Sequence, residues 1–166
     1  MIMTAVDPGG IHPGDDDREI AARQAVMAVA AAAQREELDN VLAALAPLPE
    51  ASDLRRPETG LVMTRGRAGG DGAPFNLGEA TVTRAAVRIA EGGRTVNGFA
   101  YHLGRDAARA RAAAVVDALW QLPGRRQAVE AALAPVRERL MAERETAARR
   151  TAATRVNFFT MVRGED

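Results

Sequence analysis

The chain has 166 residues, of which 47% are hydrophobic and 27% are charged, and this length and composition are typical of one folded domain. The formal net charge is zero, so no overall electrostatic field favours nucleic acid or an anionic membrane as a partner. The sequence contains no cysteine, which excludes disulfides, thiolate nucleophiles and cysteine-ligated metal centres. It also contains no lysine, which excludes a Schiff base and the lysine of a Walker phosphate site.

The N-terminal segment is polar and contains glycine and proline, so residues 1–17 are expected to form a disordered tail. This segment lacks the basic-then-apolar pattern of an export signal, and no apolar run approaches the ~20 residues of a membrane span. We therefore expect a cytoplasmic protein with no membrane partner. Residues 18–166 then form a single domain, which begins with helices over residues 18–34 and 35–45, where apolar side chains recur at helical spacing.

Three strands are predicted in the middle of the chain. Residues 61–67 and 80–89 are rich in β-type side chains and flank a glycine-rich loop over residues 68–78. Two glycines in the segment 91–94 favour a tight turn into a third strand over residues 95–103. The order of these segments predicts an antiparallel arrangement.

The C-terminal part of the chain returns to helical spacing. A helix is predicted over residues 107–121, followed by a helical segment over residues 125–150 that Pro135 must kink or divide. Residues 154–163 are again β-type and are the predicted fourth strand. The fold class is therefore α+β, with a small antiparallel sheet of about four strands flanked by N-terminal and C-terminal helices.

Four arginines lie on the first two strands, two on one face of each strand: Arg65, Arg67, Arg84 and Arg88. If the strands align these faces, the arginines converge, and guanidinium groups suit the oxygens of a triphosphate or a phosphonate. The alternative is that they form ion pairs with Asp71, Glu79 or carboxylates of a partner subunit. The first interpretation predicts an anion-binding surface on this hairpin, and the second predicts ion pairs within the chain or a contact with another subunit.

The glycine-rich loop has two interpretations as well. Backbone amides near Gly69 and Gly70 can form an anion-binding nest, or the loop needs positive φ angles and packs at an interface. A dinucleotide fingerprint is excluded, because a strand and not a helix follows the glycines. Glu58 and Glu79 are candidates for general acid or base, with turn or ion-pair roles as the alternative.

Clusters that perform catalysis are missing from the sequence. The chain has two histidines, no paired carboxylates at a suitable spacing and no motif for an activated serine, so no catalytic residue, metal site or cofactor of its own is expected. Tyr101 and Trp120 are predicted to lie in the core. Phe158 and Phe159 are adjacent in the predicted fourth strand and face opposite ways, so one can enter the core while the other meets a neighbouring subunit.

Four blocks resemble one family and occur in its order: PETGLVMTRGRAGG (57–70), PFNLGEATVTRAAVRI (74–89), LGRD (103–106) and VNFFTMVRGED (156–166). The family is PhnG, the G subunit of the bacterial carbon–phosphorus lyase system. Arg23-Gln24-x-x-Met27 is similar as well, so the resemblance covers about residues 23–166. The third strand departs from the family pattern, and His102 therefore inherits no role.

The resemblance implies a cytoplasmic core complex with subunits H, I and J, in which this chain is present in more than one copy. That complex, alpha-D-ribose 1-methylphosphonate 5-triphosphate synthase, displaces adenine from ATP by an alkylphosphonate, and ATP and alkylphosphonate are thus substrates of the complex. The resemblance implies a required subunit and assigns it no catalytic residue. The alternative is a phosphonate- or nucleotide-binding module that contributes its arginines to the active site.

Overall fold

The computed structural model describes residues 13–68 and 71–153, and these form an α+β fold as predicted. The elements in chain order are α1 (Pro13–Ala32), α2 (Arg35–Ala44), β1 (Ala51–Arg67), β2 (Pro74–Glu91), β3 (Arg94–Leu103), α3 (Ala107–Trp120), α4 (Pro123–Ala132) and α5 (Ala134–Ala153).

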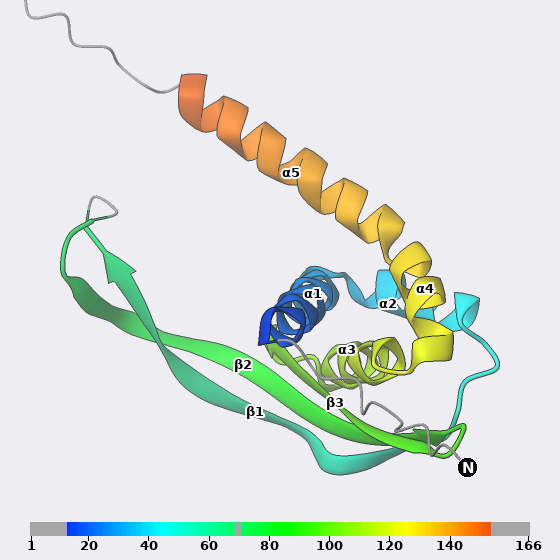
Figure 1. The fold of residues 1–166 in the computed structure, drawn as a ribbon. Helices are drawn as coiled ribbons and strands as arrows, with labels where there is room; N and C mark the ends of the chain where they lie inside the picture. The colour runs from blue at the N-terminus through cyan, green and yellow to red at the C-terminus, as the bar shows by residue number, and fades with distance from the viewer. Residues whose placement is uncertain (1–12, 69–70, 154–166) are drawn as a thin grey trace, which may run out of the picture.

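The three strands form one antiparallel sheet in the order β1-β2-β3, and the helices lie on one side of it (Figure 1). The described sheet has three strands rather than about four, because the predicted fourth segment, residues 154–163, lies outside the described residues. The turn between β2 and β3 is the predicted one: Gly92 and Gly93 have φ angles of 59° and 75°, which side-chain-bearing residues rarely adopt.

The first two strands are longer than predicted. β1 starts at Ala51 rather than at residue 61, and β2 starts at Pro74 rather than at residue 80. Pro57 does not interrupt β1. Proline lacks a backbone N–H donor, but β1 is an edge strand, so no essential hydrogen bond of the sheet is lost. Arg67 pairs with Pro74, so the predicted loop 68–78 shrinks to a short connection and its last residues join β2.

The helices begin and end close to the predicted positions. α1 begins at Pro13, so residues 13–17, which were expected in the tail, are helical. Pro135 divides the C-terminal helical segment: α4 ends at Ala132 and α5 begins at Ala134, which places Pro135 in a first turn where no backbone N–H is needed. Among the described residues, no helix has the length and apolarity to cross a bilayer.

Helix α3 forms the centre of the core, between the inner face of the sheet and the other helices. Nine of its residues are buried, including Trp120 as predicted. Its backbone approaches β3 closely at Gly98, where a Cβ atom would lie 2.0 Å from the carbonyl oxygen of Ala114. Gly98 is therefore required for this contact between helix and strand.

A buried ion pair joins α1 to α3. Asp117 is 0% exposed, and its carboxylate accepts hydrogen bonds from Nε of Arg23 at 2.9 Å and from Nη2 of Arg23 at 2.8 Å. The same carboxylate accepts the backbone N–H of Phe99 at 2.9 Å. Three elements, α1, α3 and β3, are thus held by one carboxylate, and each of its charge-assisted bonds is worth more than a neutral one.

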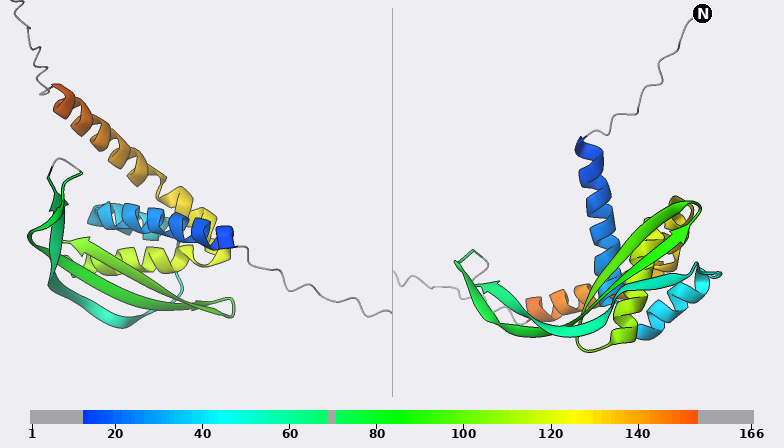
Figure 2. Two further views of the ribbon diagram at one scale, coloured as in Figure 1. Left: turned by 60° about the vertical axis from the view of Figure 1, so that its left-hand side comes forward. Right: turned by 90° about the horizontal axis from the view of Figure 1, so that it is seen from below.

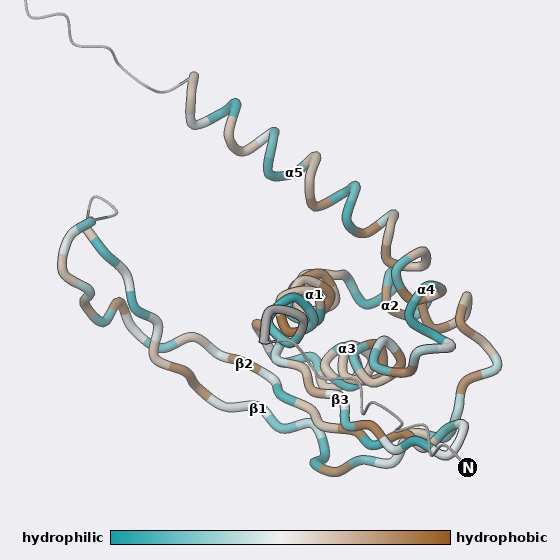
Figure 3. Tube along the Cα trace, in the orientation of Figure 1, coloured by the Kyte–Doolittle hydropathy of each residue, from teal (hydrophilic) through white to brown (hydrophobic). Residues whose placement is uncertain are grey.

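Two parts of the chain extend beyond the core. The first, here called the arm, is the distal part of the β1–β2 hairpin, residues 61–67 and 74–81, which no helix covers (Figures 1 and 2). Hydrophobic stretches occur on both of its strands (Figure 3), and its large apolar side chains are exposed, for example Leu61 at 59% and Leu77 at 63%. The second is α5, whose one fully buried residue is Val136 and which projects away from the sheet.

Candidate functional site

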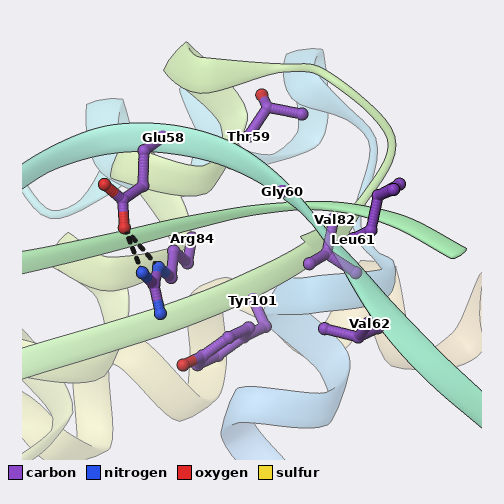
Figure 4. Close-up of a pocket in the computed structure, with 8 residues that line it drawn as sticks. All are labelled: Glu58, Thr59, Gly60, Leu61, Val62, Val82, Arg84 and Tyr101. Atoms are coloured by element: carbon purple, nitrogen blue, oxygen red, sulfur yellow. Dashed lines mark hydrogen bonds and ion pairs between the residues drawn. The ribbon is translucent and has the colours of Figure 1, made fainter. Parts of the chain in front are cut away.

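The outer face of the sheet, opposite the helices, contains a cavity of about 330 Å³ near the start of the arm. Its walls come from all three strands (Figure 4). The lining residues are Glu58, Thr59, Gly60, Leu61, Val62, Val82, Arg84 and Tyr101.

Glu58 in this cavity is an ion-paired carboxylate. Arg55 donates to it from Nη1 at 2.6 Å, and Arg84, on the neighbouring strand, donates from Nε (Figure 4). The hydrogen bonds from Arg55 and then from Arg84 lower the pKa of Glu58, and the bond to Glu58 raises the pKa of Arg84. A carboxylate held ionised by two guanidinium groups is poorly suited to proton transfer near neutral pH, so the geometry matches the ion-pair role of Glu58.

The four candidate arginines do not converge on one ligand. Arg84 lies opposite Glu58, whereas Arg65 lies opposite Asn76. Eight positions separate residues 76 and 84 on β2, which is about 26 Å of strand. The antiparallel register therefore places Arg65 and Arg67 near the tip of the arm and Arg84 just beyond its base, while Arg88, opposite Ser52, lies close to the other end of the hairpin.

Each of these arginines has its own environment. Arg88 donates from Nε to Oδ1 of Asn97 at 3.3 Å, and Arg67 donates from Nη1 to the carbonyl oxygen of Gly72 at 3.0 Å. Arg65 makes no hydrogen bond or ion pair within the described ranges. The expected carboxylate partners are not the ones found: in the same ranges neither Asp71 nor Glu79 pairs with an arginine.

The tip of the arm contains a second, shallower cavity of about 480 Å³, lined by Arg65, Gly66, Arg67 and Pro74. Gly69 and Gly70 lie outside the described residues, so the anion-binding nest stays a prediction. Phe158 and Phe159 also lie outside the described residues, and their role in subunit contact is likewise still a prediction.

The prediction that Tyr101 lies in the core is wrong. Tyr101 is 56% exposed and lies on the outer face of β3 together with Phe99 and Leu103, which are also exposed. Alternation along a strand places these three side chains on one face, but the helices pack against the other face, which holds Ala100 and His102. The outer face of β3 is consequently aromatic and lies next to Arg84 and its neighbours.

A third cavity, of about 410 Å³, lies where β3 meets α1 and the start of α3. It is lined by Ala28, Ala31, Ala32, Tyr101, His102, Leu103 and Arg109. Arg109 was not among the sequence candidates. The signal that could have identified it is an arginine in the first turn of a helix, three residues after the N-cap Asp106, where an acidic residue is the favourable choice.

Across residues 13–68 and 71–153, no histidine and carboxylate side chains group closely enough to hold a metal ion. The described part of the chain presents arginine-containing cavities and exposed apolar surface.

Comparison with known proteins gives the family. The family model of the phosphonate metabolism protein PhnG matches residues 21–164. The chain belongs to the PhnG family. A curated relative from Rhizobium meliloti (strain 1021) is 52% identical over 151 residues, which cover 91% of this chain and 95% of the relative. That relative is the alpha-D-ribose 1-methylphosphonate 5-triphosphate synthase subunit PhnG. The resemblance inferred from the four sequence blocks is thereby confirmed.

The family match includes the parts of this PhnG-family chain that define its shape. The matched range contains Arg23 and its buried partner Asp117, the whole arm, and the cavity at Arg109.

Proposed function

We propose that this chain is the G subunit of an alpha-D-ribose 1-methylphosphonate 5-triphosphate synthase in organic phosphonate catabolism. The support is the relative of that name, which aligns with the chain over nearly its full length. In this role the chain supports the displacement of adenine from ATP by an alkylphosphonate, and these two compounds are substrates of the assembled complex.

The structural observation that supports a subunit role is the arm. Leu61, Met63, Phe75 and Leu77 are large apolar side chains that are each about half exposed or more on two strands without a covering layer. Contiguous apolar surface of this kind is characteristic of a protein interface, since leaving it in water costs free energy at roughly 25 cal/mol per Å². The proposed partners are subunits H, I and J of a cytoplasmic complex that contains more than one copy of this chain.

We assign the catalytic groups to the partner subunits. Glu58, the carboxylate that lines the cavity on the outer face of the sheet, is neutralised by Arg55 and Arg84. A chain with this arrangement shapes or stabilises the complex, and the pure chain is expected to release no adenine from ATP and alkylphosphonate. Adenine release by the pure chain, measured by chromatography and removed by a mutation in this chain, would contradict this assignment.

Co-purification tests the subunit role directly. The double variant Leu61→Asp and Leu77→Asp places two charges on the arm, and it is expected to lose subunits H, I and J in a pull-down and to lose adenine release. Gln127→Asp, on the exposed surface of α4, is the matched control and is expected to assemble normally. Unchanged thermal unfolding of the isolated double variant excludes misfolding. Assembly of the arm variant at wild-type yield would refute the role of the arm.

A binding module is the second candidate function, and the outer face of β3 favours it. Tyr101 and Phe99 are exposed there and lie close to Arg84 and Arg88, so aromatic and guanidinium groups suited to a nucleotide share one surface. Under this function, Arg88→Met leaves assembly intact and raises the KM for ATP, whereas under the subunit role alone the KM is unchanged. Binding of ATP to the isolated chain distinguishes the two in a single measurement.

A further inference from the structure

Arg109 occupies a position that is unfavourable for a cation. It lies in the first turn of α3, and the carboxylate of the N-cap Asp106 accepts its backbone N–H at 2.9 Å. The N-terminal end of a helix has a positive partial charge, so a guanidinium group there is destabilising unless an anion compensates it. Asp106 provides part of that compensation, but its Oδ1 is already engaged by the backbone.

The guanidinium of Arg109 also lacks the partners that other part-buried arginines have. Its Nη2 donates to the carbonyl oxygen of Ala31 at 3.2 Å, while its Nε is buried and has no hydrogen-bond partner among the described residues. Burial lowers the pKa of Arg109, which is the opposite of the shift in the paired Arg23, Arg125 and Arg139. A buried donor without an acceptor costs free energy. Among the described residues, Nε of Arg109 is the one buried side-chain nitrogen or oxygen atom that has no hydrogen-bond partner.

Glu37 compensates Arg109 only in part. Its charge raises the pKa of Arg109, as that of Asp106 does, but Arg139 holds the Glu37 carboxylate in a bidentate pair, at 2.6 Å from Nε to Oε1 and 2.7 Å from Nη2 to Oε2. No ion pair within 4.0 Å is formed by Arg109 in the described ranges. Its positive charge is therefore available to a ligand.

His102 lines the same cavity. It is 6% exposed, its Nδ1 lies 3.4 Å from the same carbonyl oxygen of Ala31, and no hydrogen bond to its Nε2 is present among the described residues. Burial, followed by the charge of Arg109, lowers the pKa of His102, whereas Asp106 and the contact with Ala31 act in the other direction. The imidazole is thus neutral near pH 7, and a bound anion would favour its protonation.

The remaining walls of the cavity are mostly small or apolar. Besides Tyr101, they consist of three alanines of α1 and Leu103 of β3, around a space of about 410 Å³, and the alanines leave room for a group of a few atoms. The cavity thus combines one guanidinium without an ion pair in the described ranges, one buried imidazole and a mostly apolar surface. A ligand that matches all three is a small oxyanion with a short hydrocarbon substituent.

We propose that this cavity binds a tetrahedral phosphorus oxyanion with a short alkyl group, held by Arg109 and His102 against the alanines of α1. Arg109 provides a planar set of N–H donors to two oxygens, and His102 becomes a further donor when it takes up a proton. The alkyl group of the ligand rests on the proposed function, whereas the oxyanion site rests on Arg109 and His102 of this chain, so assembly with other subunits and occupancy of the cavity are tested separately.

The test measures binding to the full-length chain by NMR, with methylphosphonate and inorganic phosphate as the probes. Methylphosphonate is expected to perturb the imidazole resonances of His102 saturably and to raise the pKa of His102. Arg109→Gln is expected to weaken binding at least about tenfold, the loss typical of one charge-assisted contact. Arg111→Gln is the control, because Arg111 is on the same helix and donates to Asp53 at 2.7 Å instead.

A second variant keeps the test valid if Arg109→Gln does not fold. Ala28→Leu adds volume on the exposed side of α1, leaves Arg109 and His102 in place, and is expected to abolish binding by filling the cavity. Equal affinity for phosphate and methylphosphonate would support the oxyanion site and refute the alkyl subsite. The site itself is refuted if neither probe shifts the imidazole resonances of His102. It is also refuted if no probe binds and Arg109→Gln releases a partner subunit from the assembled complex, since a carboxylate of that partner then occupies the cavity.

Discussion

Replacing Arg23 by methionine is expected to destabilise the fold strongly. The substitution keeps an unbranched apolar side chain on α1 but leaves the carboxylate of Asp117, which is 0% exposed, with the single N–H of Phe99 as its donor. Breaking a buried ion pair from one side costs about 3–5 kcal/mol, because the remaining charge is uncompensated. The side chain of Arg23 is itself partly exposed, so solvent can replace some of the lost interaction and the lower end, about 3 kcal/mol, is expected.

Thermal unfolding of the full-length chain followed by circular dichroism measures this loss. For a domain of this size, 1 kcal/mol corresponds to about 2–4 °C in Tm, so a decrease of about 6–12 °C is expected. Arg35→Met is the matched control: Arg35 is mostly exposed and lies 3.9 Å from Asp39, so the change is expected to stay within about 0.5 kcal/mol.

A double variant separates the ion pair from general packing. Adding Asp117→Asn to Arg23→Met removes the uncompensated charge while an oxygen remains for the N–H of Phe99, so the double variant is expected to be less destabilised than the sum of the single changes. Strictly additive losses, or an Arg23→Met Tm within the range of the Arg35→Met control, would refute the reasoning.

Two further predictions concern the same region. Gly98→Ala is expected to cost several kcal/mol in a chemical denaturation, since the new Cβ would lie 2.0 Å from the oxygen of Ala114, whereas Gly60→Ala meets nothing within 4 Å and is expected to change stability by less than about 1 kcal/mol; equal effects would show that α3 and β3 separate easily. The pKa of His102 is lowered in the folded chain, so as the pH is reduced below ~6.5 the unfolded chain takes up a proton before the folded chain does. The free energy of unfolding is therefore expected to decrease until the pH reaches the folded-state pKa of His102. His102→Asn is expected to remove this decrease, and an identical decrease in both proteins would contradict the prediction.

The features predicted correctly from the sequence are those that local chemistry decides. Two glycines fix the turn at residues 91–94, and Pro135 separates α4 from α5. The inner face of α3, with Trp120 at its end, follows from helical spacing alone. In each case a few neighbouring residues determine the conformation, so no knowledge of the tertiary packing is needed.

The features predicted wrongly depend on contacts between distant segments. Alternation groups Tyr101 with Phe99 correctly, but the packing of the helices decides which face of β3 is buried. The separation of Arg65 from Arg84 depends on the register of a long hairpin, and the length of β1 depends on pairing that extends past Pro57. Arg109 was missed because its environment is built by α1, which lies far away in sequence.

The uncovered arm also affects how the isolated chain responds to proteases. A two-stranded ribbon without a supporting layer is marginally stable in water, so the arm opens locally far more often than the core unfolds. Its exposed Arg65 and Arg67 provide sites for trypsin, and the absence of lysine restricts all tryptic sites in the chain to arginine. A chain purified without partners is therefore expected to be cut first at the arm, while the core around α3 stays intact.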